Sequence, residues 1–515
     1  MLHTDLIAPI PELLRRQAGS RGNKVAYRDA HGSVTYADLL ERTGNLAGHL
    51  ADLGILPGET VAIFLPNSVQ WVETCLAIAR AGAISVPISV DATEPEIAYR
   101  LSDANCRAIV ASGERHDLVA RLRTKAPNLS TLIATDRADG NANGPRYSQL
   151  TTTTPKSPPR DPSAMHAPAF ILYTSGTTGR AKGVVLTLHG MLWITAACRA
   201  PITGLTERDI VLSPLPLFHS YALNLSVLSV LATGASEYIM ERFSTSEAVR
   251  LLQTGEFTYF PGVPTMFHYL LQATQGESDV RFPNLRACMS AGAIMPATLN
   301  REFEKRFGVP LLDGYGITET STMVTMNWPT GARVLGSCGF PVPGLAVRIV
   351  DPASGRDVVP GQEGELIVRG PNVMPGYHNK PEETQRVLRD GWYYTGDLAR
   401  SDENGFLTIT GRLKELIIRG GQNIAPAEIE EVVNTFESVL DCAVVGIPHE
   451  HLGEVAALFV VARPGGTIET EALLAHCRTQ LSAYKVPHSV HLVREIPRTG
   501  SGKVMRYKLR DALKV

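Results

Sequence analysis

The stretch TVAIFLPNSVQWVETCLAIARAGAISVPI, residues 60–88, contains the pattern on which the fold prediction rests. Two short runs of apolar and β-branched residues, 60–65 and 83–88, enclose a segment, 68–82, whose apolar residues recur with helical spacing. Such runs are typical of buried strands, and a helix between two of them is typical of a β-α-β unit. We therefore predict two parallel strands joined by a helix.

The same alternation returns further along the chain. It is found at residues 169–174, 209–217, 246–255 and 257–264. Apolar runs as short as these are also compatible with buried helix. A large α/β body with mainly parallel sheet is the simplest prediction for residues 1–411.

The amino-acid composition and pattern of the chain change at three places. Residues 151–168 are rich in Pro and Thr, which predicts an exposed connection between two lobes. From about Val347 the runs VRIV, GELIVRG and GFLTITGR indicate antiparallel, barrel-like hairpins. Residues 412–515 are predicted to form a small α+β domain. Its strand-like runs are 442–447, 455–462 and 489–493, and its helix pattern is 469–481.

Composition narrows the class of protein. The 515 residues exceed what one hydrophobic core usually holds, which predicts more than one domain. Apolar residues make up 44% and charged residues 19%, as in ordinary folded proteins. The 49 basic and 51 acidic residues leave a formal net charge of -2, so nucleic acid and anionic membrane are not expected partners.

The cysteines and the apolar runs bear on the compartment. Seven cysteines occur without C-x-x-C pairs or His-Cys clusters, which argues against a disulfide framework and a zinc site. No stretch of 18 or more apolar residues occurs. We therefore expect a cytoplasmic protein without a membrane span.

The loop YTSGTTGRAKG, residues 173–183, is rich in glycine and hydroxyl residues and follows an apolar run. Such a loop can turn several N–H and O–H groups onto a phosphate, and Lys182 adds a positive charge. It is not a Walker A loop, because Ala181 and Gly183 stand where that pattern requires Gly and Ser or Thr. A flexible surface turn is the alternative on composition alone.

Five further motifs follow this loop in a set order, and together the six resemble the adenylate-forming superfamily of acyl-CoA synthetases, non-ribosomal adenylation domains and beetle luciferases. The motifs are LPLFHSYALN (215–224), DGYGITET (313–320), GWYYTGDLA (391–399), GRLKELIIRGGQNIAPAEIE (411–430) and PRTGSGKVMRYKLR (497–510).

The resemblance implies a reaction in which a carboxylate attacks the α-phosphate of ATP, giving an acyl-adenylate and pyrophosphate, followed by thioester formation with CoA. ATP, Mg²⁺ and CoA are the implied cofactors, because positive charge must screen the two anions that meet. Glu319 would bind Mg²⁺ with the hydroxyl of Thr174 or Thr178; a solvated carboxylate is the alternative. The implied phosphate-binding residues are Thr174, Ser175, Gly176, Thr177, Thr178, Gly179 and Lys182.

The remaining nucleotide contacts are also implied by the resemblance. Tyr315 would stack on adenine, with Gly314 and Gly316 leaving room for the base; a core tyrosine is the alternative. Asp397, expected in a turn, would bind the ribose hydroxyls together with Arg412; a structural Asp in a turn or helix cap is equally plausible locally. Asp313 and Thr318 complete the implied ATP and AMP contacts.

The resemblance gives the C-terminal domain a mobile role, with a hinge at Lys414. Lys503 would bridge the carboxylate and the α-phosphate, although a lysine in such a loop is more often solvated. Pantetheine would pass Gly420, Gly421 and Gln422, where a tight turn is the alternative. Ile418 departs from the family, because many relatives have lysine there. His219, Thr178 and Glu319 join Lys503 in the implied catalytic set.

The implied acyl pocket is almost free of charge. His219 and Tyr221 would line its carboxylate end, and Ser290, Ala291, Gly292 and Gly339 belong to the other walls. The stretches that supply these walls contain no Arg or Lys, which disfavours a dicarboxylate such as malonate. FHSYALN also resembles plant coumarate-CoA ligases, so we expect an apolar acid, either aryl or medium-chain fatty.

Three alternatives stay open from the sequence. The enzyme could load the acyl group onto the phosphopantetheine of an acyl carrier protein, in which case CoA is a poor substrate. It could oxidise the adenylate as luciferases do. It could also be a non-catalytic nucleotide sensor, which the presence of Lys182, Glu319, Asp397 and Lys503 disfavours.

Overall fold

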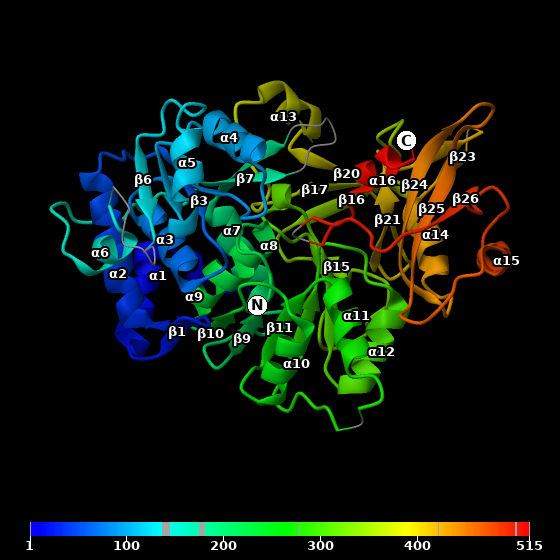
Figure 1. Ribbon diagram of the computed structural model, residues 1–515, viewed down its shortest axis with the longest axis horizontal. Helices are drawn as coiled ribbons and strands as arrows, with labels where there is room; N and C mark the ends of the chain where they lie inside the picture. Colours follow the sequence, from blue (N-terminus) through cyan, green and yellow to red (C-terminus); the bar gives the residue numbers. More distant parts are fainter. Residues whose placement is uncertain are drawn as a thin grey trace. The chain divides into compact units, whose positions relative to one another are not determined.

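The computed structural model describes residues 2–135, 145–174, 181–277, 279–420, 422–499 and 502–513 (Figure 1). The chain folds into two compact units. Unit 1 comprises Met1–Arg333, Pro341–Ala346 and Arg369–Gly391, and unit 2 comprises Val334–Phe340, Val347–Val368 and Trp392–Val515. None of the helices in these ranges combines the length and apolarity needed to cross a membrane.

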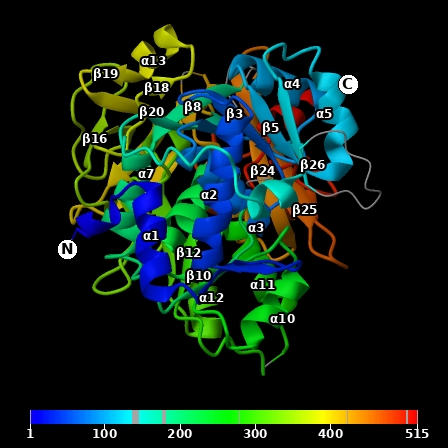
Figure 2. The same ribbon diagram turned by 90° about the vertical axis from the view of Figure 1, so that its left-hand side faces the viewer.

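A β-α-β unit built from the stretch quoted first lies at the centre of one sheet of unit 1. Strand β3 (Thr60–Phe64) and strand β4 (Ile84–Pro87) are parallel, and helix α3 (Val69–Arg80) joins them, as predicted. The Ser68 hydroxyl accepts a hydrogen bond from the Trp71 N–H at 3.2 Å and begins the helix. Helix α2 (Tyr36–Asp52) packs against α3 (Figure 2).

This seven-stranded sheet has the order β18-β8-β7-β4-β3-β5-β6. Its parallel part continues through β5 (Ala108–Ala111) and β6 (Thr131–Ala134). An antiparallel hairpin, β7 (Pro168–Thr174) and β8 (Lys182–Thr187), adds the strands that flank the glycine-rich loop. Strand β18 (Gly376–Tyr377) pairs with β8 and so brings a distant segment to that hairpin.

The second sheet of unit 1 contains the row β14-β13-β12-β11-β9-β10-β1-β2. Strands β9 to β13 pair in parallel, which confirms the α/β prediction. The apolar run 209–217 is a strand only up to Ser213. The strand bounds are β1 (Val25–Arg28), β2 (Ser33–Thr35), β9 (Ile210–Ser213), β10 (Ser236–Ile239), β11 (Tyr259–Gly262), β12 (Ala287–Ser290), β13 (Leu311–Tyr315) and β14 (Thr325–Met326).

Helices cover the strands of unit 1. Residues 153–167 form a largely exposed connection between α6 and β7, whereas Thr151 is buried in α6, and the connection lies within unit 1 rather than between two lobes. The two-residue strands β15 (Phe340–Pro341) and β19 (Leu388–Arg389) lie near points where the chain changes unit. The other helices of unit 1 are α1 (Ile10–Arg21), α4 (Glu94–Asp103), α5 (His116–Leu122), α6 (Tyr147–Thr152), α7 (Leu188–Ile194), α8 (Ser220–Ala222), α9 (Val230–Thr233), α10 (Thr245–Gln253), α11 (Pro264–Ala273), α12 (Ala297–Phe307) and α13 (Pro381–Val387).

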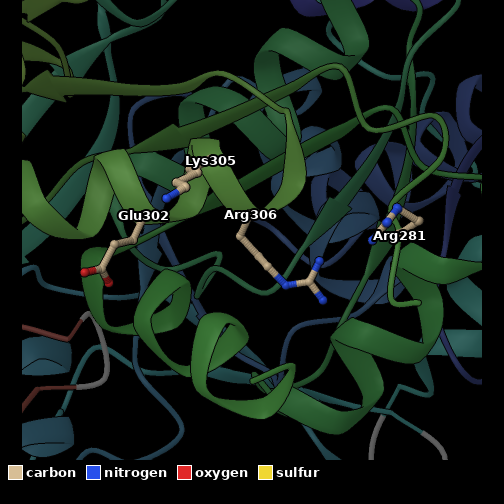
Figure 3. Close-up of a pocket in the computed structure, with 4 residues that line it drawn as sticks. All are labelled: Arg281, Glu302, Lys305 and Arg306. Carbon is tan, nitrogen blue, oxygen red and sulfur yellow. The ribbon is translucent and has the colours of Figure 1, made fainter. Parts of the chain in front are cut away.

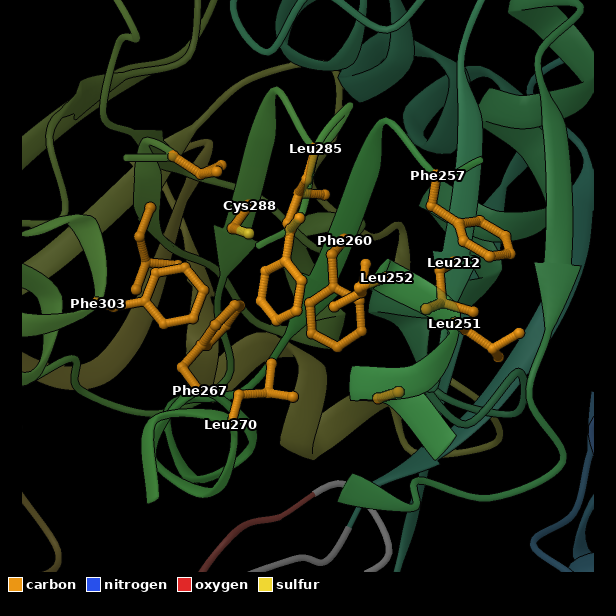
Figure 4. Close-up of a cluster of buried hydrophobic side chains, with 14 of the residues drawn as sticks. Leu212, Leu251, Leu252, Phe257, Phe260, Phe267, Leu270, Leu285, Cys288 and Phe303 are labelled. Atoms are coloured by element: carbon orange, nitrogen blue, oxygen red, sulfur yellow. The ribbon is translucent and has the colours of Figure 1, made fainter. Parts of the chain in front are cut away.

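Aromatic rings fill the core beneath the second sheet (Figure 4). Phe267 of α11 lies between Phe260 of β11 and Phe303 of α12, with ring centroids 5.8 and 5.2 Å away and the rings near perpendicular. Such edge-to-face pairs add to the free energy of burial. Gly262 accommodates this packing, because a Cβ there would lie 3.0 Å from the Phe267 ring.

Unit 2 contains the predicted antiparallel strands in the order β16-β17-β20, with β21 paired to β20. Strand β20 is antiparallel to both β17 and β21, which confirms the hairpin prediction. These strands are β16 (Ala346–Val350), β17 (Gly364–Arg369), β20 (Trp392–Ser401) and β21 (Leu407–Arg412).

The C-terminal part of unit 2 is an α+β layer, as predicted. The long hairpin of β24 (Val439–His449) and β25 (Gly453–Ala462) carries β26 (Ser489–Leu492) in parallel beside β25. The other elements are β22 (Ile417–Arg419), β23 (Gln422–Ile424), α14 (Pro426–Val433), α15 (Thr470–Gln480) and α16 (Arg506–Asp511).

All seven cysteines are buried and none forms a disulfide. Burial raises the pKa of Cys75 and of Cys106 to about 12. Their thiols therefore stay protonated at neutral pH.

Phe267→Ala is expected to lower the free energy of unfolding by about 3–5 kcal/mol, because it leaves a cavity between two buried rings. Denaturation by urea, followed by circular dichroism, measures the change. Tyr269→Ala, on the same helix with a side chain 42% exposed, is the matched control and should change stability by about 0.5 kcal/mol or less. Equal midpoints for the two variants would contradict this description of the core.

Candidate functional site

The carboxyl ends of β11, β12 and β13 bring several predicted residues to one edge of the sheet. Gly262 stands opposite Ser290, and Ser290 stands opposite Asp313, in the register of the parallel strands. Loops that follow parallel strands meet at this edge, which is where α/β proteins bind ligands. Tyr221 reaches the same place, since its hydroxyl donates to the Met289 carbonyl oxygen at 3.1 Å.

Asp313 and Ser290 are both buried there. Burial raises the pKa of Asp313 well above its usual range, an effect opposed by the Gly314 N–H and the Ser290 hydroxyl. Asn327 binds the Asp313 carbonyl oxygen through its side-chain amide, at 3.0 Å. Asp313 is therefore a buried group that is held through its main chain, beside the predicted acyl residues.

His219 and Tyr221 flank the start of the short helix α8. The His219 ring is half-buried, and its Nδ1 accepts a hydrogen bond from the Tyr221 N–H at 3.3 Å. In a neutral His219 ring the proton therefore sits on Nε2. Burial raises the pKa of Tyr221 well above its usual range, so its hydroxyl acts as a donor. The Ser220 hydroxyl lies 3.3 Å from the Thr318 hydroxyl and links α8 to the GYGITET motif.

The GYGITET motif forms a tight, buried turn after β13. A 3₁₀ turn, Thr318–Thr320, is followed by Ser321 and Thr322 with positive φ angles of 50° and 94°. A positive φ is unfavourable for a β-branched residue such as Thr322, so the turn is strained. Strain of this kind concentrates at functional sites because the surrounding structure must hold it in place.

Gly314 and Gly316 are required by this turn itself. A Cβ on Gly316 would lie 1.6 Å from the Thr322 carbonyl oxygen, and one on Gly314 would lie 2.5 Å from Met323 Cε. From the sequence, these glycines are expected to leave room for the adenine base. In the structure the close approach of residues 322–323 already requires them, and the half-buried Tyr315 stands between the two glycines.

Asn372, which the sequence analysis did not single out, holds the strained turn. Its buried side-chain amide donates to the carbonyl oxygens of Thr320, at 2.7 Å, and Met323, at 2.9 Å. The Ser321 hydroxyl donates back to the Asn372 carbonyl oxygen at 2.7 Å. These bonds join segments about fifty positions apart in sequence, and no local sequence pattern around Asn372 predicts them.

Tyr377 of β18 contacts two of the predicted residues, and it too was missed. Its hydroxyl donates to Glu319 Oε1 at 2.9 Å, and the Lys182 ammonium lies 5.2 Å from the centre of its ring. Lys182 also forms an ion pair with Glu383 of α13, which lowers the pKa of that carboxyl. The structure therefore brings Lys182 and Glu319 to one aromatic ring.

The glycine-rich loop is described only at its ends. Thr174 ends β7 and faces Lys182, the first residue of β8, across the hairpin. The predicted phosphate residues between them, Ser175, Gly176, Thr177, Thr178 and Gly179, lie outside the described residues. Within the described ranges no three His, Cys, Asp or Glu side chains gather into a metal-binding cluster.

Asp397 and Arg412 meet in unit 2. They stand opposite each other across β20 and β21, and Arg412 Nε lies 2.8 Å from Asp397 Oδ1. The expectation that Asp397 lies in a turn is wrong, because it lies within strand β20. Gly396 before it has a φ of 71°, and its N–H bonds Glu365 Oε1 at 2.9 Å. The direction of the Asp397 side chain is therefore set by a local irregularity in the strand and not by a chain reversal.

The C-terminal residues of the prediction are spread over unit 2. Lys503 is half-buried, and its N–H and carbonyl oxygen both bond Thr499. Gly420, with a φ of 56°, and Gln422 belong to the tight connection of β22 and β23, while Gly421 lies outside the described residues. Ile418 is exposed on β22.

Four predicted residues remain. Lys414 follows β21 in unit 2. Gly339 also belongs to unit 2, with a φ of 83°, whereas Ala291 and Gly292 follow β12 in unit 1.

A surface hollow of about 440 Å³ lies elsewhere on unit 1 and is lined by Arg281, Glu302, Lys305 and Arg306 (Figure 3). It contains none of the predicted residues. The hollow is therefore not the candidate site.

Comparison with known proteins gives matches over nearly the whole chain. The family model for AMP-binding enzyme matches residues 14–378, and the model for AMP-binding enzyme C-terminal domain matches residues 428–503. A feruloyl-CoA synthase of Amycolatopsis sp is 34% identical over 96% of this chain and 97% of its own. A long-chain-fatty-acid–CoA ligase of Bacillus subtilis is 33% identical, over 92% and 89%. The ATP-bound structure of MatB from Rhodopseudomonas palustris superposes with a TM-score of 0.89 at 31% identity, covering 98% and 99%.

Asn372→Ala is expected to lower the free energy of unfolding by about 2–4 kcal/mol, because two buried carbonyl oxygens lose their donor. Asn45→Ala, which removes one half-buried bond to the Thr151 carbonyl oxygen, is the control and should cost about 1 kcal/mol. Chemical denaturation compares the two variants. A cost for Asn372→Ala no larger than that of the control would show that the amide does not hold the turn.

Proposed function

The chain belongs to the AMP-binding enzyme family and is an AMP-forming acid–CoA ligase that works through an acyl-adenylate, and from that premise we propose its acid and the roles of its residues. The acid is apolar, either aryl or medium-chain fatty. Low charge in the stretches 260–264, 289–296, 320–326 and 336–343 supports this, and the named relatives act on a feruloyl group and on long-chain fatty acids.

The contact of Tyr377 with both Glu319 and Lys182 is the observation that carries the proposal. Adenylation brings a carboxylate to a polyphosphate, so the site must hold a phosphate-binding cation beside a group that can hold a metal ion. Lys182 and the residues Thr174 to Gly179 bind the β- and γ-phosphates of ATP. The half-buried Glu319, aimed by Tyr377, is the partner for Mg²⁺.

The donor set suits Mg²⁺, which prefers oxygen ligands and usually shares them with substrate phosphates. Glu319 would hold the ion with the hydroxyl of Thr174 or Thr178. Bound there, Mg²⁺ supplies positive charge against the phosphates of ATP. This chain's own residues orient the reactants: Tyr315 and Asp313 with Gly314, Gly316 and Thr318 on the adenine side, and Asp397 with Arg412 at the ribose.

Residues from both halves of the sequence act on the reacting groups. His219 and Tyr221 position the carboxylate, whose oxygen attacks the α-phosphorus while the bond to the β-phosphate breaks and pyrophosphate leaves. Lys503 offsets the negative charge that develops in that step.

In the second half-reaction the thiol of CoA attacks the acyl carbon, and AMP leaves. We propose that residues 412–515 form the mobile domain, with Lys414 as the hinge, and that Gly420 to Gln422 line the pantetheine path. The acyl end of the thioester lies against Ser290, Ala291, Gly292 and Gly339.

Mass spectrometry of the products formed from ATP, Mg²⁺, CoA and a panel of aryl, medium-chain and long-chain acids tests the proposal. Acyl-CoA from aryl or medium-chain acids is the expected result. Formation of acyl-adenylate without thioester would indicate that a carrier protein, and not CoA, is the acceptor. Acyl-CoA from long-chain acids alone would overturn the proposed substrate class.

Lys503→Ala is expected to slow acyl-adenylate formation at least about 100-fold, because its charge acts in the transition state of that step. Thioester formation from supplied acyl-adenylate and CoA should continue. Pyrophosphate release and CoA consumption measure the two steps separately. Lys508→Ala, at an exposed lysine of α16, is the control and should leave both rates unchanged. An unaffected first step in Lys503→Ala would remove this residue from the mechanism.

Tyr377→Phe is expected to raise the Mg²⁺ concentration for half-maximal adenylation about tenfold, since the Glu319 carboxylate loses the hydroxyl that orients it. Titration of Mg²⁺ at saturating ATP measures the shift. Tyr269→Phe, at an exposed tyrosine of the same unit, serves as control. An unchanged Mg²⁺ dependence would separate Tyr377 from the metal-binding role of Glu319.

A further inference from the structure

Arg199 is a fully buried arginine that the sequence analysis did not consider. Its side chain is 0% exposed, and it ends the π-helical segment η3 (Thr195–Arg199). A second π-helical segment, η4 (Leu223–Ser229), packs beside η3, and the Thr195 and Ser229 hydroxyls lie 2.8 Å apart. Such segments cost regular hydrogen bonding and occur frequently at functional sites.

The guanidinium of Arg199 contacts only neutral groups among the described residues. Its Nε donates to Asn224 Oδ1 at 3.0 Å, and its Nη1 contacts the Met289 sulfur. The central carbon of the group lies 5.5 Å from the centre of the Tyr221 ring. Within the described ranges no carboxylate forms an ion pair with it, and its Nη2 has no hydrogen-bond partner.

Arg80 of the same unit shows how this chain satisfies a structural buried arginine. Its Nε and Nη2 both bond the Asp161 carboxylate, at 2.8 and 3.1 Å, and its Nη1 donates to the Leu40 carbonyl oxygen. A buried charge without an opposite charge is destabilising, and evolution normally pairs it. Arg199 departs from this rule, and a purely structural role does not account for a donor left without an acceptor.

The position of Arg199 ties it to the acyl substrate. His219 bonds the backbone of Tyr221, whereas Arg199 and Met289 contact the ring and the hydroxyl of the same tyrosine. The reacting carboxyl group is assigned to the His219 end, so Arg199 lies toward the other end of the acyl site, beside Ser290 at the end of β12. We propose that Arg199 is a specificity-determining residue whose Nη2 binds an oxygen acceptor, preferably anionic, at the end of the acid remote from its reacting carboxyl group. This rests on the proposed function and narrows it to acids whose apolar body carries such an oxygen.

The proposal also revises an expectation from sequence. Absence of Arg and Lys from the wall stretches disfavoured acids with a second charge, but Arg199 comes from a different segment. A cation beside Met289 favours a remote phenolic or carboxylate oxygen over a plain hydrocarbon end, because the latter leaves the guanidinium unpaired.

Pairs of acids that differ only in an oxygen-bearing group at the remote end test the proposal. Suitable pairs are benzoate with 4-hydroxybenzoate, cinnamate with 4-hydroxycinnamate and with 4-carboxycinnamate, and hexanoate with adipate. The kcat/KM for AMP formation is measured for each acid with the intact enzyme. In the pair that contains the best substrate, the oxygenated acid is expected to be preferred at least tenfold.

Arg199→Met should abolish that preference while plain acids are still activated. Arg199→Met removes an unpaired buried charge but also the donor to Asn224 Oδ1, so its thermal unfolding temperature is measured beside its activity. Arg199→Lys, which keeps the charge, should retain part of the preference. Tyr259→Phe, which removes the hydroxyl that contacts the Met289 sulfur and the Thr203 side chain but not Arg199, is the control and should retain all of it.

The possible outcomes are distinct. Equal kcat/KM values within every pair, or a preference that survives in Arg199→Met, would overturn the inference while the proposed function stands. Should Arg199→Met fail to fold, an unaltered preference in Arg199→Lys together with reduced stability would assign the arginine to structure alone. No AMP from any acid would overturn the proposed function and this inference with it.

Discussion

The approach of the Gly316 backbone to the carbonyl oxygen of Thr322 is the constraint on which the unit 1 site depends. No side chain fits between these two points, so the chain after β13 must turn back on itself over six residues. The turn is strained at Thr322, and Asn372 holds it from a segment far away in sequence. Glu319 and Thr318 project from this turn, so their positions follow from a contact that involves neither of them.

The same turn links the two sheets of unit 1. Thr318 contacts Ser220, which follows the second sheet, and Glu319 contacts Tyr377, whose strand extends the first. The residues proposed to bind phosphate and the acyl group are therefore connected through one short piece of backbone. A ligase that joins a carboxylate to the α-phosphate of ATP needs such a connection, because the two groups must be held within bonding distance.

The fold was predictable where its signals are local. The β-α-β unit at residues 60–88 and the C-terminal α+β layer each follow from apolar spacing along a short segment, and both are confirmed. Strand β20 shows the limit, because TGD reads as a turn by composition but lies within a strand whose irregularity is absorbed by Gly396. The family motifs pointed to Lys182, Glu319 and Asp397, and the structure places partners around each of them.

The partners themselves could not be read from the sequence. Asn372, Tyr377 and Arg199 act on residues 52, 58 and 90 positions away, and nothing in their own surroundings distinguishes them from ordinary polar residues. The glycines of GYGITET show a related difficulty. Their presence was evident, but the reason for it, a close approach of the chain to itself, exists only in the folded molecule.

The burial of every cysteine has a consequence for an enzyme of this chemistry. An acyl-adenylate reacts with any accessible thiolate, so a protein that generates one is at risk of acylating itself. Here the cysteine sulfurs are buried, and burial keeps the Cys75 and Cys106 thiols protonated. The cysteines of the protein therefore do not compete for the activated acid. The thiol that reacts with it is that of the bound acceptor.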